Sequence, residues 1–283
     1  MTATVVIVGY RAYAELEQCL ASLAAHEPDV PVVVVDHAAD EARGRGLTAA
    51  FPRVTYLPRR ENPGFAAGVN YAARHAGPGP LLLLNPDCQI AAPVVAPLSN
   101  VLAAHPDAGV VGGLIREGNG ALQHSARLFP DITTALGGRT SWLSRVAPNN
   151  PLSRRNLKAA PADGIVPVDW VSGAFTLIRR EAFDQVRGFD EGFFLYWEDA
   201  DFCKRAADAG WLTLYAPVAE AVHLTARASR HAPLRSLRAF HRSAFRYYWK
   251  HGGVAARLAS PAVALGLVAR FLTRLVLRDR SPR

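Results

Sequence analysis

Short apolar runs alternate with helical patterns along the first half of the chain. Runs of β-branched and other apolar residues, bounded by turn-forming residues, predict strands at 4–8, 31–35, 54–57 and 81–84. Apolar residues at helical spacing lie between these runs, as in 65–75. Strands that are apolar throughout must be covered on both faces. The alternation therefore predicts an α/β fold with a mostly parallel sheet and helices on both of its faces.

The second half of the chain returns to this pattern after a long interruption. Residues 116–165 are weakly patterned and rich in Gly, Pro, Asn and Arg, which is typical of a lid or binding segment. We expect this stretch to recognise part of a ligand. Further strands are predicted at 110–113, 170–178 and 211–215, and helices at 180–186 and 198–209.

The composition is that of a globular protein. The chain has 283 residues, of which 50% are hydrophobic and 20% are charged, and this excludes a disordered or disulfide-stapled chain. Cys19, Cys88 and Cys203 form no C-x-x-C pair, so we expect three small core residues in a reducing compartment. The first apolar run is too short for a signal sequence, which predicts a cytoplasmic protein.

Positive charge is concentrated at the C-terminal end. The formal net charge is +8, but residues 227–283 carry 13 Lys and Arg against one acid, Asp279, whereas 1–226 carry 19 against 23 acids. The body is thus mildly acidic. A nucleic-acid-binding protein would need basic and aromatic residues interleaved on its folded body, so this class is disfavoured. We predict a folded domain at 1–226 and a basic tail at 227–283.

The tail has the pattern of amphipathic helices. Arg235, Arg238, Arg242 and Arg246 recur every three or four residues, which places them along one helical face. The apolar stretch at 262–277 is too short and too charged for a transmembrane helix. We predict that the tail lies on an anionic membrane surface, on the inner face of the cell membrane. The alternative is a helix packed on the folded body or on a second subunit of a homo-oligomer.

Two acids follow predicted strands. Asp36 ends one strand, and Asn85 and Asp87 follow another, which we expect to be its neighbour. In open parallel sheets, ligands bind beyond such strand ends. Carboxylate and carbonyl oxygens are the ligands that Mg²⁺ and Mn²⁺ prefer, so the sequence indicates a polar ligand and a hard cation. Turn formation or helix capping is the alternative role for either acid.

A second group of acids opens a predicted helix. Glu198, Asp199 and Asp201 directly follow a segment, 188–197, that is rich in aromatic residues. Acids at a helix N-terminus are favoured by the helix dipole, and capping with solvated charge is their ordinary explanation. Acids beside so many aromatic residues instead indicate a lined pocket.

Several short segments occur in a fixed order along residues 3–225. They are 5–10, 34–36, 62–70, 83–87, 172–174, 179–183, 188–191 and 198–201. In sequence and order they resemble the glycosyltransferase family 2 enzymes, especially the rhamnosyltransferase-like branch. The resemblance implies a GT-A fold, with a nucleotide-sugar-binding half at 1–115 and an acceptor and catalytic half at 116–226. The basic tail would be a C-terminal helical extension.

The resemblance also implies an activity, the transfer of a sugar from a nucleotide diphosphate to an acceptor hydroxyl with inversion. It implies that Asp199 is the general base, that Asp36 bonds the donor's base, and that Asp87 and His223 bind Mg²⁺ or Mn²⁺. A structural histidine is the alternative for His223. The other donor-binding positions that it implies are Tyr10, Asn62, Gly64, Phe65, Gly68, Asn70 and Asn85. The acceptor-side positions are Ser172, Gly173, Trp197 and Glu198.

Chemical reasons support these roles. A departing sugar-nucleotide diphosphate gains negative charge, which a divalent cation neutralises. Inversion by direct displacement needs a carboxylate on the opposite face to take the acceptor's proton. Asn85 stands where the family has the first acid of its D-x-D motif, so metal affinity should depend on bound diphosphate. His37, Gly9 and Arg11 also depart from the family pattern.

The donor implied by the resemblance is dTDP-rhamnose, with UDP-galactose, UDP-glucose and UDP-galactofuranose left open. The acceptor would be a glycan or lipid-linked precursor of a cell-surface polysaccharide or glycolipid. Other classes fit less well. Gly9-Tyr10-Arg11 is not the triphosphate loop of a nucleotidyltransferase, and Gly64 and Gly68 lack the dinucleotide-binding spacing. The chain also has no G-x-S-x-G elbow of a hydrolase.

Overall fold

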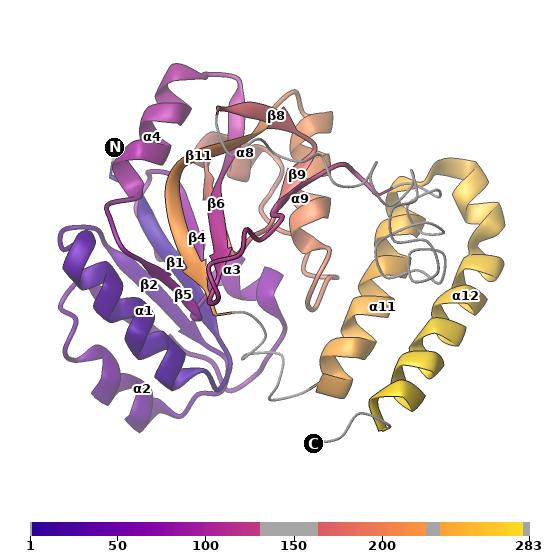
Figure 1. Ribbon diagram of the computed structural model, residues 1–283, viewed down its shortest axis with the longest axis horizontal. Helices are drawn as coiled ribbons and strands as arrows, with labels where there is room; N and C mark the ends of the chain where they lie inside the picture. Colours follow the sequence, from indigo (N-terminus) through magenta and orange to yellow (C-terminus); the bar gives the residue numbers. More distant parts are fainter. Residues whose placement is uncertain (1, 131–163, 225–232, 280–283) are drawn as a thin grey trace.

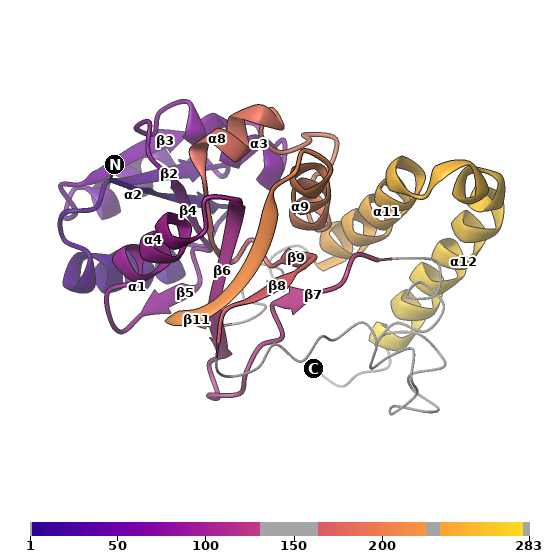
Figure 2. The ribbon, with the colours of Figure 1, turned by 90° about the horizontal axis from the view of Figure 1, so that it is seen from above.

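The computed structural model describes residues 2–130, 164–224 and 233–279. A central sheet lies between two layers of helices, and two long helices stand at one side (Figure 1; Figure 2). The elements as far as residue 117 are β1 (Thr4–Gly9), α1 (Tyr13–His26), β2 (Val32–Asp36), α2 (Glu41–Thr48), β3 (Val54–Pro58), α3 (Phe65–Ala73), β4 (Leu81–Leu84), β5 (Cys88–Ile90), α4 (Val95–Ala104) and β6 (Ala108–Glu117). The later elements are β7 (Ala126–Arg127), β8 (Val166–Val168), β9 (Trp170–Val171), β10 (Phe175–Ile178), α8 (Arg180–Gln185), α9 (Glu198–Asp208), β11 (Leu212–His223), α11 (Pro233–His251) and α12 (Gly253–Asp279).

The main sheet has nine strands within the described residues, in the order β3-β2-β1-β4-β10-β6-β11-β5, and β8 also pairs with β11. β1 pairs in parallel with β2 and β4, and β2 with β3. β10 runs antiparallel between β4 and β6, and β5 runs antiparallel to β11. The predicted α/β fold with C-terminal helices is confirmed. One detail was wrong, because β1 separates β2 from β4 and Asp36 and Asp87 do not follow neighbouring strands.

The apolar strands are buried on both faces. Along β1, Val5 and Ile7 pack into the core that α1 and α4 cover, whereas Val6 and Val8 pack into the core under α3, α8 and α9. Successive side chains of a strand point to opposite faces, so a strand between two helical layers must be apolar at every position. The three cysteines are buried and unpaired, as predicted.

The strand predicted at 170–178 is divided in two. β9 ends at Val171 and pairs with β7 in a separate two-stranded sheet, whereas β10 begins at Phe175 and enters the main sheet. Between them, Ser172 N–H donates to Ser125 O at 3.0 Å, and Ala174 O accepts from Asn85 N–H at 2.9 Å. The backbone of residues 172–174 therefore bonds to two other segments instead of continuing one strand.

The helix α11 packs on the body. The ring of Trp197 lies against Phe240 and Tyr247, with centroids 5.8 and 5.4 Å away. The Ser243 hydroxyl donates to Leu195 O at 3.0 Å. The four arginines of the predicted basic face all lie on α11 and are exposed, as the spacing predicted. Two of them also reach the body, because Arg235 lies over the ring of Phe194 and Arg246 pairs with Asp190.

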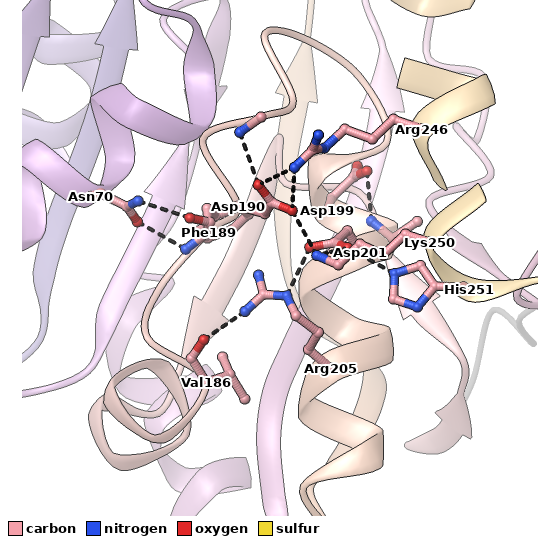
Figure 3. Close-up of polar contacts among 12 residues, drawn as sticks. Asn70, Val186, Phe189, Asp190, Asp199, Asp201, Arg205, Arg246, Lys250 and His251 are labelled. Carbon is pink, nitrogen blue, oxygen red and sulfur yellow. Dashed lines mark hydrogen bonds and ion pairs between the residues drawn. The ribbon is translucent and has the colours of Figure 1, made fainter. Parts of the chain in front are cut away.

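An ion cluster joins α9 to α11 (Figure 3). Asp201 is fully buried, and its carboxylate accepts from Arg205, Lys250 and His251 at 2.8, 2.7 and 2.7 Å. Lys250 also lies 2.7 Å from Asp190. Burial alone would raise the pKa of Asp201, but the bonds from His251 and Lys250 lower it. The cluster thus holds an ionised carboxylate between cations from both helices.

The helix α12 packs along α11, and the rings of His241 and Phe271 meet at 5.7 Å. Within the described part of the chain, no helix has the length and apolar character needed to cross a membrane. The domain boundary expected at residue 226 lies outside the described residues, as does most of the 116–165 stretch assigned to recognition.

Removing the buried carboxylate should destabilise the protein far more than removing an exposed one on the same helix. Asp201→Ala leaves Arg205 without its counter-charge and Lys250 with Asp190 alone, and breaking such a buried pair costs about 3–5 kcal/mol. Asp208→Ala removes only an exposed pair with Lys204, and should cost less than about 1 kcal/mol. Urea unfolding measures both free energies. Similar losses for the two variants would show that the cluster adds no stability.

Candidate active site

Asp36 ends β2 as a buried carboxylate with three donors. Tyr13 and Tyr56 hydroxyls donate to its Oδ2 at 2.8 and 2.6 Å, and Ala38 N–H donates to Oδ1 at 2.9 Å. Burial and the bond to Asp36 raise the pKa of Tyr13 to about 12, so this hydroxyl keeps its proton. A carboxylate offers about four acceptor positions, so Oδ1 can accept one further donor. Tyr10 lies instead beside Arg11, whose guanidinium is 5.3 Å from its ring.

The two glycines of the 62–70 segment are required by close packing. Gly64 has φ +107°, and a Cβ there would lie 2.2 Å from Phe194 O. A Cβ on Gly68 would meet Val8 and His37 at 2.6 and 2.8 Å. The His37 ring is buried and lies with Nε2 3.1 Å from Gly64 O. The glycines thus allow the start of α3 to approach β1 and the backbone of Phe194. Their contact with a donor stays a prediction.

The polar residues of this segment bond to protein groups. The Asn62 side chain accepts from Gly64 N–H at 3.1 Å. The Asn70 amide donates to Phe189 O at 2.9 Å and accepts from Phe189 N–H at 2.8 Å (Figure 3). Phe65 N–H donates to Phe194 O at 2.9 Å. These contacts hold the loop before α9 against α3. Binding of a donor by the same residues stays a prediction.

Asp87 and His223 meet because β5 pairs with the end of β11. His223 Nε2 lies 3.1 Å from Asp87 Oδ1, across 136 positions of sequence. On the other side, His223 Nδ1 lies 2.9 Å from the amide oxygen of Gln123. An amide oxygen only accepts, so this contact suits a proton on Nδ1. A cation shared by Asp87 and His223 would need Nε2 without a proton, which the neutral ring with its proton on Nδ1 provides.

Two neighbours of this pair contribute differently. The ligand atoms of Asp87, Cys88 and His223 lie within 4.8 Å of one another. Burial and the charge of Asp87 raise the pKa of Cys88 well above its usual value, so in the absence of a cation the thiol keeps its proton, and it donates to Ala174 O at 3.5 Å. Asn85 Nδ2 lies 3.5 Å from His223 Nε2, beside the pair. The ligands expected for a cation are the carboxylate of Asp87 and the imidazole of His223.

The turn at 172–174 connects this pair to the acids of α9. Ala174 O accepts from Asn85 N–H at 2.9 Å, and Gly173 N–H donates to Asp199 Oδ2 at 3.3 Å. Ser172 takes part through its backbone, since its carbonyl accepts from the Thr176 hydroxyl at 2.7 Å. One short backbone segment thus fixes the positions of Asp87 and Asp199 relative to each other.

Asp199 is the acid that faces this turn. Ala200 N–H donates to its Oδ1 at 2.9 Å, so both carboxylate oxygens are held by backbone N–H groups. Burial raises the pKa of Asp199, and the bonds from Ala200 and Gly173 and the charge of Arg127 offset this only in part. An oriented carboxylate with raised basicity is what a general base requires.

The other two acids of the group have different surroundings. Asp201 belongs to the ion cluster with α11. Glu198 is 5% exposed, and burial, followed by the charge of Asp199, raises the pKa of Glu198 to about 8. Glu198 is therefore a neutral acid at pH 7. Helical geometry points three neighbouring acids in three directions, and only Asp199 adjoins the turn.

The segment before α9 is strained. Tyr196 and Trp197 have φ values of 67° and 70°, which place two non-glycine residues in the left-handed region at about 1–2 kcal/mol each. Such conformations persist where the surroundings fix them, and often lie at functional sites. Here Phe240 and Tyr247 of α11 hold the Trp197 ring. The indole thus faces the tail, and its predicted contact with an acceptor stays untested.

Four residues of the site had no signal in the sequence. Tyr13 and Tyr56 lie in elements without a recognisable motif, and they reach Asp36 only in the fold. Gln123 and Arg127 fall in the weakly patterned stretch, where spacing gives no direction to a side chain. No periodicity could have found them, because each contacts a partner on a distant element.

The fold and the site define a glycosyltransferase. Residues 2–247 match the family model described as "Glycosyltransferase like family 2". The chain belongs to this family, and the resemblance drawn from the ordered segments is confirmed.

Two relatives are named for rhamnose transfer. The chain is 34% identical over 255 residues to the N-acetylglucosaminyl-diphospho-decaprenol L-rhamnosyltransferase of Mycobacterium tuberculosis. This match covers 85% of this chain and 82% of the relative. It is 40% identical over 80 residues to Rhamnosyltransferase WbbL of Escherichia coli, a match over 28% of this chain and 30% of that one.

Solved structures share the fold at low identity. A mannosyltransferase from Pyrobaculum calidifontis in complex with GDP-Man and Mn²⁺ has a TM-score of 0.58 and 18% identity, over 97% of this chain and 75% of that one. GalNAc-T7 with UDP, GalNAc and Mn²⁺ has a TM-score of 0.60 and 17% identity, over 79% of this chain and less than half, 44%, of that one. These likenesses establish a GT-A-like fold.

Glu198→Gln should stabilise the protein increasingly as the pH rises. The pKa of Glu198, about 8, exceeds its ordinary value of 4.5, so the unfolded chain loses this proton before the folded one does. The stability that the proton provides is complete below pH 4.5 and is lost as the pH rises through about 8. Gln keeps the shape without titrating.

We expect the Tm of E198Q to equal that of the wild type near pH ~4 and to exceed it at pH ~8.5. Each kcal/mol of added unfolding free energy should raise the Tm by about 2–4 °C. Glu181→Gln, at an exposed position, is the control and should show no such trend. A difference in Tm that does not change with pH would contradict the raised pKa of Glu198.

Proposed function

We propose that this protein is an inverting rhamnosyltransferase that moves rhamnose from dTDP-rhamnose to a hydroxyl of a lipid-linked glycan. The supporting observation is the turn at 172–174, which bonds both Asn85 and Asp199 and so sets a diphosphate-binding end against a base. The donor and the lipid-linked acceptor are supported by similarity to the mycobacterial L-rhamnosyltransferase. UDP-hexoses and UDP-galactofuranose are the alternative donors for the same site.

The nucleotide base of the donor would be read at Asp36. Its Oδ1 retains one acceptor position, which suits the ring N–H of thymine or uracil. The hydroxyls of Tyr13 and Tyr56 fix the carboxylate, because both donate to Oδ2. Tyr10, at the end of β1, would flank the base.

Asp199 would act as the general base. As the acceptor oxygen attacks the anomeric carbon from the face opposite the nucleotide, the hydroxyl proton passes to Asp199, and the bond to the diphosphate breaks with inversion. The N–H groups of Gly173 and Ala200 hold the carboxylate in one orientation. Its raised pKa makes it a stronger base than an exposed Asp.

Asp87 and His223 would hold a divalent cation on the diphosphate. Their donor atoms would be a carboxylate oxygen and, in the tautomer with the proton on Nδ1, the imidazole Nε2 3.1 Å away, which fits Mg²⁺ or Mn²⁺. When bound, such a cation neutralises the charge of the leaving diphosphate. Two protein ligands do not complete its coordination, so diphosphate oxygens must contribute. The Mn²⁺ named with two solved neighbours supports this assignment.

The tail would bring the enzyme to its lipid-linked acceptor. The outer side of α12 leaves Val254, Leu258 and Leu265 exposed by 73, 79 and 71%, at helical spacing. An apolar helix face on an arginine-rich tail suits an anionic membrane surface. A homo-oligomer through this face is the alternative. Nucleic acid is disfavoured as a partner, because Arg246 and Lys250 are engaged by carboxylates of the body.

A donor panel with Mn²⁺ tests the function. We expect transfer, or slow hydrolysis in the absence of an acceptor, from dTDP-rhamnose but not from UDP-galactose, UDP-glucose or UDP-galactofuranose.

Asp199→Asn should lower transfer by about 10²–10⁴-fold while still binding the donor, because only proton removal is lost. Turnover by D199N at the wild-type rate would remove the assignment of the base, and no response to any nucleotide sugar would overturn the function.

Gln123→Met should weaken Mn²⁺ binding without removing a metal ligand. Loss of the group that fixes the His223 tautomer is expected to raise the Mn²⁺ concentration needed for half-maximal activity by about 10–100-fold. The rate at saturating Mn²⁺ should change little. Gln89→Met is the control, since the Gln89 amide bonds only the side chain of Gln18 among the described residues. An unchanged Mn²⁺ requirement for Q123M would show that Gln123 does not orient the histidine.

A further inference from the structure

A groove runs between α11 and α12, on the side of α11 that faces away from the body. Its volume is about 460 Å³, within the range of small-molecule sites. The floor and walls are apolar, apart from two arginines and one histidine. The lining residues are Arg238, His241, Arg242, Phe245, Ala264, Leu267, Val268 and Phe271.

The charge at this groove is of one sign. Arg238 and Arg242 lie one turn apart on α11, and both are exposed. Neither forms an ion pair with any of the described residues, in contrast to Arg246 on the same helix, which pairs with Asp190. No Asp or Glu occurs from residue 227 to 278, so the groove has no acid of its own to neutralise them.

We propose that this groove binds the lipid part of the acceptor, an isoprenoid diphosphate. This inference rests on the proposed function, which requires a lipid-linked acceptor. The long apolar chain would lie on Phe245, Leu267 and Phe271, where it buries apolar surface. The diphosphate would meet Arg238 and Arg242, because paired guanidinium groups match phosphate oxygens in charge and geometry.

The groove is connected to the base by direct packing. His241 lies on the groove, and its ring is 5.6 Å from that of Phe240. Phe240 in turn lies 5.8 Å from Trp197, the residue that caps the helix opened by Glu198 and Asp199. A lipid held in the groove would therefore lie across α11 from the strained turn before α9, and His241 and Phe240 would connect the two by packing.

Binding of farnesyl diphosphate to the full chain tests the proposal without activity. Binding is measured by calorimetry in saturating dTDP and Mn²⁺, because bound dTDP keeps farnesyl diphosphate out of the proposed donor site. We expect saturable binding, at least about tenfold tighter than that of farnesol or of inorganic diphosphate, because chain and charge both contribute. Equal binding of farnesol would overturn the proposed diphosphate contact, and no saturable binding of farnesyl diphosphate would overturn the site.

Two kinds of variant locate the binding. Arg238→Ala with Arg242→Ala removes the charge, and Ala264→Trp fills the groove without changing charge. Each should weaken farnesyl diphosphate binding by at least about tenfold. The controls are Arg257→Ala and Ala262→Trp, at exposed positions of α12 outside the lining, which should leave the Kd within about twofold. Equal effects of groove and control variants would overturn the proposal.

Further measurements separate this inference from its premises. If farnesyl diphosphate binds in the groove but no nucleotide sugar is used, the proposed function fails and the lipid site stands. If sugar transfer occurs and the groove variants leave the KM for a lipid-linked acceptor unchanged, the site fails and the function stands. Anionic phospholipid vesicles are the last probe. Vesicle binding that the groove variants abolish, without binding of farnesyl diphosphate, would overturn the proposal in favour of bulk membrane lipid.

Discussion

The arrangement of the site depends on the backbone of one turn, residues 172–174. Its groups bond outward to Ser125, Asn85 and Asp199 instead of continuing a strand. Three segments that are far apart in sequence are thereby held against one another. Two of the bonds join main-chain groups, which have no rotamers to change, and the third is accepted by the Asp199 carboxylate. Gly173 lies beside Phe65 and Asp199, since a Cβ there would make ordinary van der Waals contacts with them at 3.7 and 3.8 Å. The backbone of this turn therefore sets how the proposed metal pair lies relative to the proposed base.

The C-terminal tail is joined to this site. Its charge indicated an appendage, yet α11 supplies cations to Asp190 and Asp201 and aromatic rings to Trp197. The strained turn before α9 is held from the tail side, and the same helix forms one wall of the lipid groove. Acceptor binding and positioning of the base would thus meet on a single helix.

The sequence predicted the elements well and the contacts unevenly. Apolar runs located β1 to β4 within one or two residues, because a strand covered on both faces has no polar positions. The same signal failed at 170–178, where two strands of different sheets are both buried and nothing in their composition marks the turn. The pairing of Asp87 with His223 followed from the family resemblance, whereas their partner Gln123 did not. A residue that acts through another residue carries no spacing relation that a pattern could reveal.

By itself, the sequence determined the fold class and the family and indicated the acids proposed to carry the chemistry, because burial periodicity and ordered motifs are local properties of the chain. The tertiary structure decided what each acid does. Glu198, Asp199 and Asp201 are near neighbours in sequence, but one is buried and neutral, one is held by backbone N–H groups, and one is paired with cations. Charge state depends on what surrounds a group in space, and those surroundings come from α11, β11 and the turn at 172–174, which only folding brings together.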